Sequence, residues 1–381
     1  YAYNIPLSSG NVTPMGDPAS LIRHIALTQQ SNSNLKWERS ETYNIGLDFM
    51  LFNDHLNVTA DYYEKYTRGL IQTNQANPHL GVDQGPTSNV GDILNKGFEL
   101  SLNYADNING LGYSIGGNIS TNANEVLHLD GFTSDFIQHG DNVRSVILPY
   151  RSEPGQPLYS YYLIPQTGIF QSAEEIQSYT GSDGNLIQPN ARPGDLKFED
   201  VNNDGRISDG DRKFMGSAMP NFTYGFNIRL DYKNFDLGIF GQGVSGVKLF
   251  NAYKFSTYNA GLQGYNLDKA VLDAWTPENP TTEIPVLSTQ DPNNNFGTAS
   301  DWYLENGSYL RVKNLSLGYT FPSALMNNLR SGTSARVYVS SENLLTFTNY
   351  TGLDPEVGRI GMDTGNYPIP RTFTVGVNVN F

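Results

Sequence analysis

The stretch NFTYGFNIRLDY, residues 221–232, alternates strictly between two kinds of side chain. Every second residue is aromatic or aliphatic, and these residues are Phe222, Tyr224, Phe226, Ile228, Leu230 and Tyr232. The residues between them are polar, charged or glycine. Successive side chains of a β-strand point to opposite faces of a sheet, so this period of two predicts a strand with one apolar and one polar face.

The same alternation recurs along the chain and predicts an all-β protein built from antiparallel strands. The nine expected strands lie near residues 40–52, 56–67, 97–105, 111–122, 221–232, 235–245, 309–321, 335–349 and 371–381. No segment has the periodicity of a long amphipathic helix. Alternation of this kind fits both a soluble β-sandwich and a transmembrane β-barrel, so other features must separate the two.

Three features favour the barrel. Tyr and Phe gather near the strand ends of the apolar faces, as in the aromatic girdles of outer-membrane barrels. The opposite faces carry Asn, Ser, Thr, Gly and Asp, which suit a water-filled lumen. Short connections at 53–55, 106–110, 233–234 and 322–334 alternate with long ones at 68–96, 123–220, 246–308 and 350–370, as turns and external loops do in such barrels. We therefore expect lipid contact at Tyr43, Ile45, Leu47, Phe222, Phe226, Ile228, Val375 and Val377.

The last expected strand ends at Phe381, and a terminal aromatic residue resembles the signal read by outer-membrane assembly machinery. Placing Phe381 in the periplasm puts every short turn on that side and every long loop outside the cell. Single-chain bacterial barrels have an even number of strands, and an open edge in lipid leaves backbone groups unpaired. Residues 1–381 are therefore expected to form the C-terminal part of a larger barrel, without its plug and earlier strands.

Composition excludes several other classes. The chain has 381 residues, no cysteine and a formal net charge of −14. It therefore has no disulfide scaffold and no thiolate zinc site, and we expect no nucleic-acid partner because basic clusters are missing. The five histidines lie outside any recognisable catalytic context, so we do not expect an enzyme. They are His24, His55, His79, His128 and His139.

Residues 200–211, DVNNDGRISDGD, have the spacing of a calcium loop. The expected oxygen ligands are Asp200, Asn202, Asp204, Arg206 through its carbonyl, Ser208 directly or through water, and Asp211. Gly205 permits the sharp turn that wraps such ligands around Ca²⁺. Position 12 is Asp rather than Glu, which shortens its reach. The alternative is an Asn-Asp-Gly turn without an ion. In either case the role is structural, at the base of the long external loop 123–220.

Several segments resemble the SusC/RagA-type TonB-dependent outer-membrane transporters. The segments are NVGDILNKGFEL at 89–100, GDLKFEDVNNDG at 194–205, YLRVKNLSLGY at 309–319, NLLTFTNYTGLDPE at 343–356 and PRTFTVG at 370–376. The resemblance implies a barrel of about 22 strands with an N-terminal plug, of which this chain supplies about the last nine strands. It also implies a location in the bacterial outer membrane, in contact with its lipid.

The resemblance further implies partners and substrates. A SusD-like surface lipoprotein is expected to contact loops 123–220 and 246–308, and 68–96 is a further candidate. The TonB complex would act through the N-terminal part, which has no counterpart in residues 1–381. Substrates would be oligosaccharides or peptides, and Trp275, Trp302 and Tyr161 are candidates for stacking on sugar rings. For each of these aromatic residues the alternative is packing within a loop.

A different class of protein stays open at this point. A secreted, calcium-stabilised, β-rich module for glycan binding or adhesion would also have alternating strands and an acidic loop. Extraction separates the two, because a barrel partitions with detergent-solubilised outer membrane whereas a secreted module stays in water.

Overall fold

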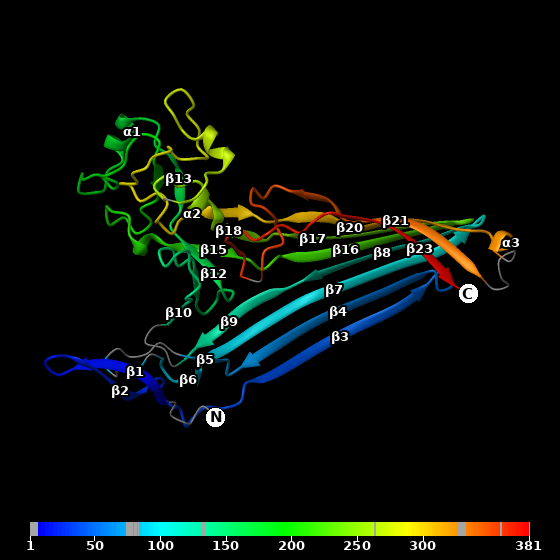
Figure 1. Cartoon of the computed structure of the whole chain (residues 1–381), viewed down its shortest axis with the longest axis horizontal. Helices are drawn as coiled ribbons and strands as arrows, with labels where there is room; N and C mark the ends of the chain where they lie inside the picture. The colour runs from blue at the N-terminus through cyan, green and yellow to red at the C-terminus, as the bar shows by residue number, and fades with distance from the viewer. Residues whose placement is uncertain are drawn as a thin grey trace.

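The computed structural model describes residues 7–73, 79, 82, 84–130, 135–262, 264–326, 333–358 and 360–380. Its main element is an antiparallel sheet in which nine long strands lie side by side in chain order (Figure 1). The strands are β3 (Arg39–Leu51), β4 (Leu56–Arg68), β7 (Gly91–Ile108), β8 (Leu111–Thr121), β16 (Phe222–Tyr232), β17 (Phe235–Ser245), β20 (Tyr309–Thr320), β21 (Ser334–Thr348) and β23 (Thr372–Asn380). All nine predicted strands are confirmed.

One boundary differs by more than a few residues. Strand β7 begins at Gly91 rather than near residue 97, because β9 (Ala123–Leu129) pairs with its first part. The predicted strand end at Phe381 lies outside the described residues.

The strand register confirms that the sheet has two chemically different faces. One cross-strand row is entirely apolar and consists of Tyr104, Ile115, Ile228, Ile239 and Leu315. A row on the opposite face consists of Ser101, Asn118, Gly225, Gln242 and Arg311. We call these the apolar face and the polar face. Because cross-strand neighbours share a face, the period of two in each strand is propagated across the whole sheet.

The apolar face is exposed, as a surface that lies against lipid must be. Ile45, Val375 and Val377 are 73%, 81% and 63% exposed, and Tyr43 and Leu47 are exposed as well. Phe222, Phe226 and Ile228 lie on the same face and are partly exposed. A soluble sandwich would bury these residues against a second sheet.

The short connections have the backbone that tight hairpins require. Asn109 and Gly110 join β7 to β8 with φ of 52° and 82°. A two-residue turn with positive φ at both positions matches the twist of paired strands, and Asn-Gly adopts it readily. The short connections lie at one end of the sheet, together with the C-terminal end of β23, and we call this the turn end (Figure 1). The long connections lie at the opposite, loop end.

At the loop end, the connections β9–β16, β17–β20 and β21–β23 fold together around a shared core, and we call this assembly the loop unit (Figure 1). Its elements are β10 (Ile137–Gln138), β11 (Tyr150–Ser152), β12 (Ser160–Leu163), β13 (Gln166–Ile169), α1 (Ala173–Ser178), β14 (Leu196–Phe198), η2 (Asp209–Asp211), β15 (Lys213–Ser217), β18 (Lys248–Asn251), α2 (Tyr253–Thr257), η3 (Lys269–Asp273), η4 (Asp301–Tyr303), β19 (Leu304–Asn306) and β22 (Met362–Asp363). The sequence predicted long loops here but not a common core.

The remaining elements are small. A hairpin of β1 (Leu7–Met15) and β2 (Ser20–Leu27), which the sequence did not predict, precedes the main sheet. Strands β5 (Ile71–Thr73) and β6 (Thr87–Asn89) pair within the β4–β7 connection, and α3 (Ser323–Met326) lies at the turn end. Among the described residues, no helix is long and apolar enough to cross a membrane.

Candidate functional site

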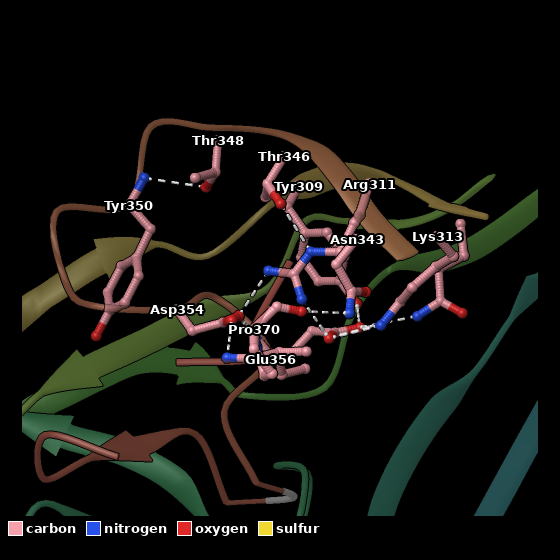
Figure 2. A network of polar contacts seen from close by, with 12 residues as sticks. Tyr309, Arg311, Lys313, Asn343, Thr346, Thr348, Tyr350, Asp354, Glu356 and Pro370 are labelled. Atoms are coloured by element: carbon pink, nitrogen blue, oxygen red, sulfur yellow. Dashed lines mark hydrogen bonds and ion pairs between the residues drawn. The ribbon is translucent and has the colours of Figure 1, made fainter. Parts of the chain in front are cut away.

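A network of charged and polar side chains lies on the polar face at the loop end of the sheet (Figure 2). Arg311 and Lys313 come from the first residues of β20. Asp354 and Glu356 come from the β21–β23 connection, which folds back over the same face. We call the set of Gln242, Tyr309, Arg311, Lys313, Asp354 and Glu356 the rim network. Its charged members join two segments that are more than forty residues apart in the chain, and Gln242 adds a contact from β17.

Glu356 is the centre of the rim network. Its carboxylate accepts hydrogen bonds from Gln242 Nε2 at 2.8 Å, Tyr309 Oη at 2.8 Å, Arg311 Nη1 at 2.6 Å and Lys313 Nζ at 2.8 Å. Arg311 also donates from Nη2 to Asp354 Oδ1 at 2.8 Å and from Nε to Thr346 Oγ1 at 2.7 Å. Each nitrogen of this guanidinium therefore has a partner, and two of the partners are carboxylates.

Arg311 lies buried at the middle of the rim network, its charged partners are half-buried, and the charges of the network balance. The Arg311 side chain is 4% exposed, and Asp354 and Glu356 are 12% and 15% exposed. Burial raises the pKa of Glu356, but hydrogen bonds from Lys313 and Tyr309 more than offset this, so the pKa lies below its ordinary value. Burial and the Arg311 hydrogen bond oppose each other in the same way at Asp354, whose pKa is also lowered. Both carboxyl groups are thus ionised at neutral pH.

The rim network fixes the backbone of the β21–β23 connection. Asp354 accepts from the N–H of Glu356 at 2.9 Å and from the N–H of Ile369 at 3.1 Å. Asn343 Nδ2 donates to the carbonyl of Pro370 at 3.1 Å (Figure 2). Both arms of the connection are therefore tied to the sheet, the first by charged hydrogen bonds from Arg311 and Lys313 and the second by the amide of Asn343.

A cleft of about 580 Å³ lies beside the rim network. Its described lining consists of Asn124, Leu158, Tyr159, Ser217, Ala218, Met219, Pro220, Val244, Val247, Leu249, Tyr309, Pro355, Glu356, Val357, Gly358 and Ile360. Most of these side chains are apolar, and Glu356 is the only charged one among them. The volume lies within the range of roughly 300–1,000 Å³ that ligand pockets occupy.

The three aromatic residues predicted to stack on sugars are core residues of the loop unit. Trp275 and Trp302 are each 6% exposed, and Tyr161 is fully buried. Trp275 Nε1 donates to Gln171 Oε1 and Trp302 Nε1 donates to the carbonyl of Glu283, both at 2.9 Å. The prediction of a stacking surface is therefore wrong for this structure, because the ring faces are covered. The alternative, packing within a loop, is what the structure has.

The expected calcium loop is wrapped around Asp200. Its carboxylate accepts from the N–H groups of Asp204 at 3.1 Å and Gly205 at 2.9 Å, and Gly205 has a φ of +83°. Asn202 Oδ1 accepts from the N–H of Asp204, and Asp204 Oδ1 accepts from the N–H of Arg206. These oxygen donors are of the type that Ca²⁺ binds.

Asp211, the last expected ligand, is turned toward backbone N–H groups of its own loop. Asp211 is fully buried, and its carboxylate accepts from the N–H groups of Val201, Asn202 and Ser208. Ser208 and Asp211 form a capping box at η2. Among the described residues, no group of three or more His, Cys, Asp or Glu side chains is arranged to hold a metal ion. Hydrogen bonds thus close this loop, and calcium stays a prediction.

The rim network was not predicted from the sequence, although its charged members lie in segments 309–319 and 343–356, which resemble the SusC/RagA family. The signal in the sequence was the position of these charges relative to the strand ends. Arg311 is on the polar face at the end of its strand that adjoins a long loop, and Lys313 lies at a β-bulge next to it. Asp354 and Glu356 follow in the next long loop, so two cations and two anions meet at the same end of the sheet.

An antiparallel sheet with one exposed apolar face, one polar face and long connections at a single end is a segment of a transmembrane β-barrel. The comparisons with known proteins agree with this class. The family model "TonB dependent receptor-like, beta-barrel" matches residues 3–344. The chain belongs to this family, and its likeness to SusC makes it a SusC/RagA-type member, found in the bacterial outer membrane.

Individual relatives extend this result. TonB-dependent receptor P3 of Formosa agariphila is 34% identical over 385 residues, covering 94% of this chain and 36% of the relative. TonB-dependent receptor SusC of Bacteroides thetaiotaomicron is 26% identical over 359 residues, covering 92% of this chain and 32% of the relative. The chain thus spans about a third of the length of these curated relatives.

Solved structures show the same fold. The structure of the RagAB peptide transporter superposes with a TM-score of 0.77 at 24% sequence identity, covering 99% of this chain and 38% of that chain. The structure of the RagAB peptide importer in the "open-open" state superposes with a TM-score of 0.77 as well. At this identity the likeness concerns the fold, including the loop unit.

Proposed function

We propose that this chain forms part of a TonB-dependent importer that takes up oligosaccharides or peptides across the outer membrane. The observation that carries the proposal is the two-faced sheet, with a lipid-type surface outside and a continuous polar wall inside. Membership of the TonB-dependent receptor family supports it. A secreted glycan-binding or adhesion module is disfavoured, because it would expose the whole apolar face to water.

The test is energised uptake by cells that carry the full-length gene. Cells should accumulate labelled oligosaccharides or peptides only when the gene is present, and a protonophore should abolish the accumulation because TonB coupling draws on the proton gradient. Accumulation that is unchanged by deletion of the gene would overturn the proposal.

A SusD-like surface lipoprotein is the proposed partner, and the loop unit, built mainly from residues 123–220 and 246–308, is its proposed contact surface. Leu272 supports this placement, since it is 77% exposed on the β17–β20 connection. An isolated exposed leucine is common, but the same connection also exposes Leu267 and Leu287. Deleting the outer part of 246–308 would also remove core residues such as Trp302, so a point substitution is the sharper test.

Leu272→Asp should weaken co-purification of the lipoprotein with the full-length protein by several-fold. A buried charge at an interface is unfavourable, and apolar contact is lost with it. Leu325→Asp is the matched control, because Leu325 is 56% exposed on α3 at the turn end, out of reach of an external lipoprotein. Equal co-purification with both variants would remove 246–308 from the contact surface, without affecting the barrel assignment.

Calcium at residues 200–211 is proposed as a structural ion held by Asp200, Asn202, Asp204, Arg206 and Asp211. The double substitution of Asp200 and Asp204 by Ala, or addition of a chelator, should speed protease cleavage between residues 194 and 216. Asp209→Ala is the control, since Asp209 is exposed and lies in the same loop without being an expected ligand. If the chelator changes nothing while the double substitution does, hydrogen bonding alone holds the loop.

A further inference from the structure

The cleft beside the rim network has walls that are held in place independently of one another. Residues 355–358 and Ile360 form one wall, which the rim network fixes through Glu356. The facing wall includes Leu158, whose N–H donates to Asn124 Oδ1 at 2.8 Å. Asn124 donates in turn to Asn95 Oδ1 at 2.8 Å on the polar face. Both walls are thus pinned to the sheet before any ligand enters.

The floor of the cleft is an apolar cluster. Val247, Leu249 and Tyr350 are buried together, and Val244 and Val357 pack against them while also lining the cleft. An apolar side chain placed in the cleft would therefore extend an existing core rather than form an isolated contact. Burial of apolar surface is the driving force that such a floor offers.

The polar groups around the cleft are already in use. The carboxylate of Glu356 accepts from four donors, and Arg311 and Lys313 are turned onto it. The ring of Tyr159 is stacked on His139 with a centroid distance of 3.7 Å, so one of its faces is covered. A sugar needs hydrogen-bond partners for each hydroxyl that it brings out of water. The described lining offers few such partners, and the anionic Glu356 disfavours an acidic ligand.

We propose that this cleft binds an uncharged apolar side chain of a peptide, and that the rim network is a positioning device that sets the shape of one wall. This inference rests on the proposed import function and narrows its substrate class. The occupant we commit to is a peptide with an aliphatic or aromatic residue, because its backbone can remain in the polar lumen while one side chain enters the apolar cleft.

The experiment measures binding to the full-length protein in detergent by calorimetry. The probes are blocked glycine tetrapeptides whose third residue is Leu, Phe, Ser or Asp, together with maltotetraose. The Leu and Phe peptides should bind at least about tenfold more tightly than the Ser and Asp peptides, as expected when an apolar pocket discriminates by buried surface. Maltotetraose should not compete with them.

Two variants locate the binding in the cleft. Val357→Asp places a charge on the cleft wall and should weaken binding of the Leu peptide by about tenfold or more. Val357→Phe narrows the cleft without adding charge and should weaken the Phe peptide more than the Leu peptide. Leu353→Asp is the matched control, since Leu353 is 48% exposed in the same connection and does not line the cleft.

The outcomes separate this inference from the import proposal. Equal affinity for the Leu and Ser peptides would overturn the apolar-peptide assignment. The assignment would also fail if maltotetraose competed with the peptides and Val357→Asp abolished that competition. So would the absence of all peptide binding in a protein that still supports energised uptake in cells. If accumulation in cells does not require the gene, the import function itself is refuted.

Discussion

Arginine in place of Ile228 should keep the full-length protein out of the outer membrane, whereas arginine in place of Asn227 should not. Ile228 lies between Ile115 and Ile239 near the middle of its strands, on the apolar face. A cation at the bilayer midplane on the lipid face of a barrel costs about 2–4 kcal/mol. Asn227 points to the polar face one residue away, so it tests the same strand with the same new side chain.

Outer-membrane fractionation and heat-modifiable migration of the folded barrel are the measurements. Ile228→Arg should lower the folded, membrane-inserted fraction severalfold at equal expression, and Asn227→Arg should resemble the unsubstituted protein. If both variants insert equally well, the apolar face is not in contact with lipid. If only Asn227→Arg fails, the two faces have been assigned the wrong way round.

The period of two made most of the sheet predictable from sequence. Side-chain direction in a strand depends on the residue's position alone, so one strand such as residues 222–232 reveals its faces without any knowledge of its neighbours. The loop unit could not be predicted in this way. Its core joins Leu163 of the β9–β16 connection to Phe250 and Trp302 of the β17–β20 connection, and their meeting depends on how the strands bring those connections together.

The same limit explains the aromatic residues of the loops. Trp275 and Tyr161 are amphipathic side chains that serve equally well as stacking platforms and as core residues with a hydrogen-bonded edge. Sequence identity alone cannot separate these roles, whereas burial separates them at once. The rim network was missed for a related reason, since the meaning of Asp354 and Glu356 depends on a connection folding back onto β20.

Removing the carboxylate of Glu356 should release the β21–β23 connection from the wall of the barrel. Glu356→Ala leaves Lys313 without its carboxylate partner and Arg311 with Asp354 as its one remaining acid. Removing one partner of a buried ion pair typically costs about 3–5 kcal/mol, and we expect the lower end because Asp354 stays in place. The effect should be local, because the nine strands keep their own hydrogen bonds.

Hydrogen exchange of residues 349–371 measures this release, with the strands β16 and β17 as internal references. Exchange in that connection should accelerate by about two orders of magnitude, which is what about 3 kcal/mol of local stability corresponds to. Glu342→Ala is the control, because Glu342 is an exposed glutamate on the neighbouring strand β21. An acceleration confined to Glu356→Ala would establish the rim network as the anchor of this connection.

Glu356→Gln separates charge from shape at the same position. The amide keeps the size of the side chain and one acceptor oxygen, but it turns an NH₂ group toward a cluster of donors from Gln242, Tyr309, Arg311 and Lys313. If ionic attraction dominates, the glutamine variant should exchange nearly as fast as the alanine variant. If packing of the side chain dominates, it should remain close to the unsubstituted protein. We expect the first result, because four donors converge on one carboxylate, and a neutral amide oxygen can satisfy at most two of them.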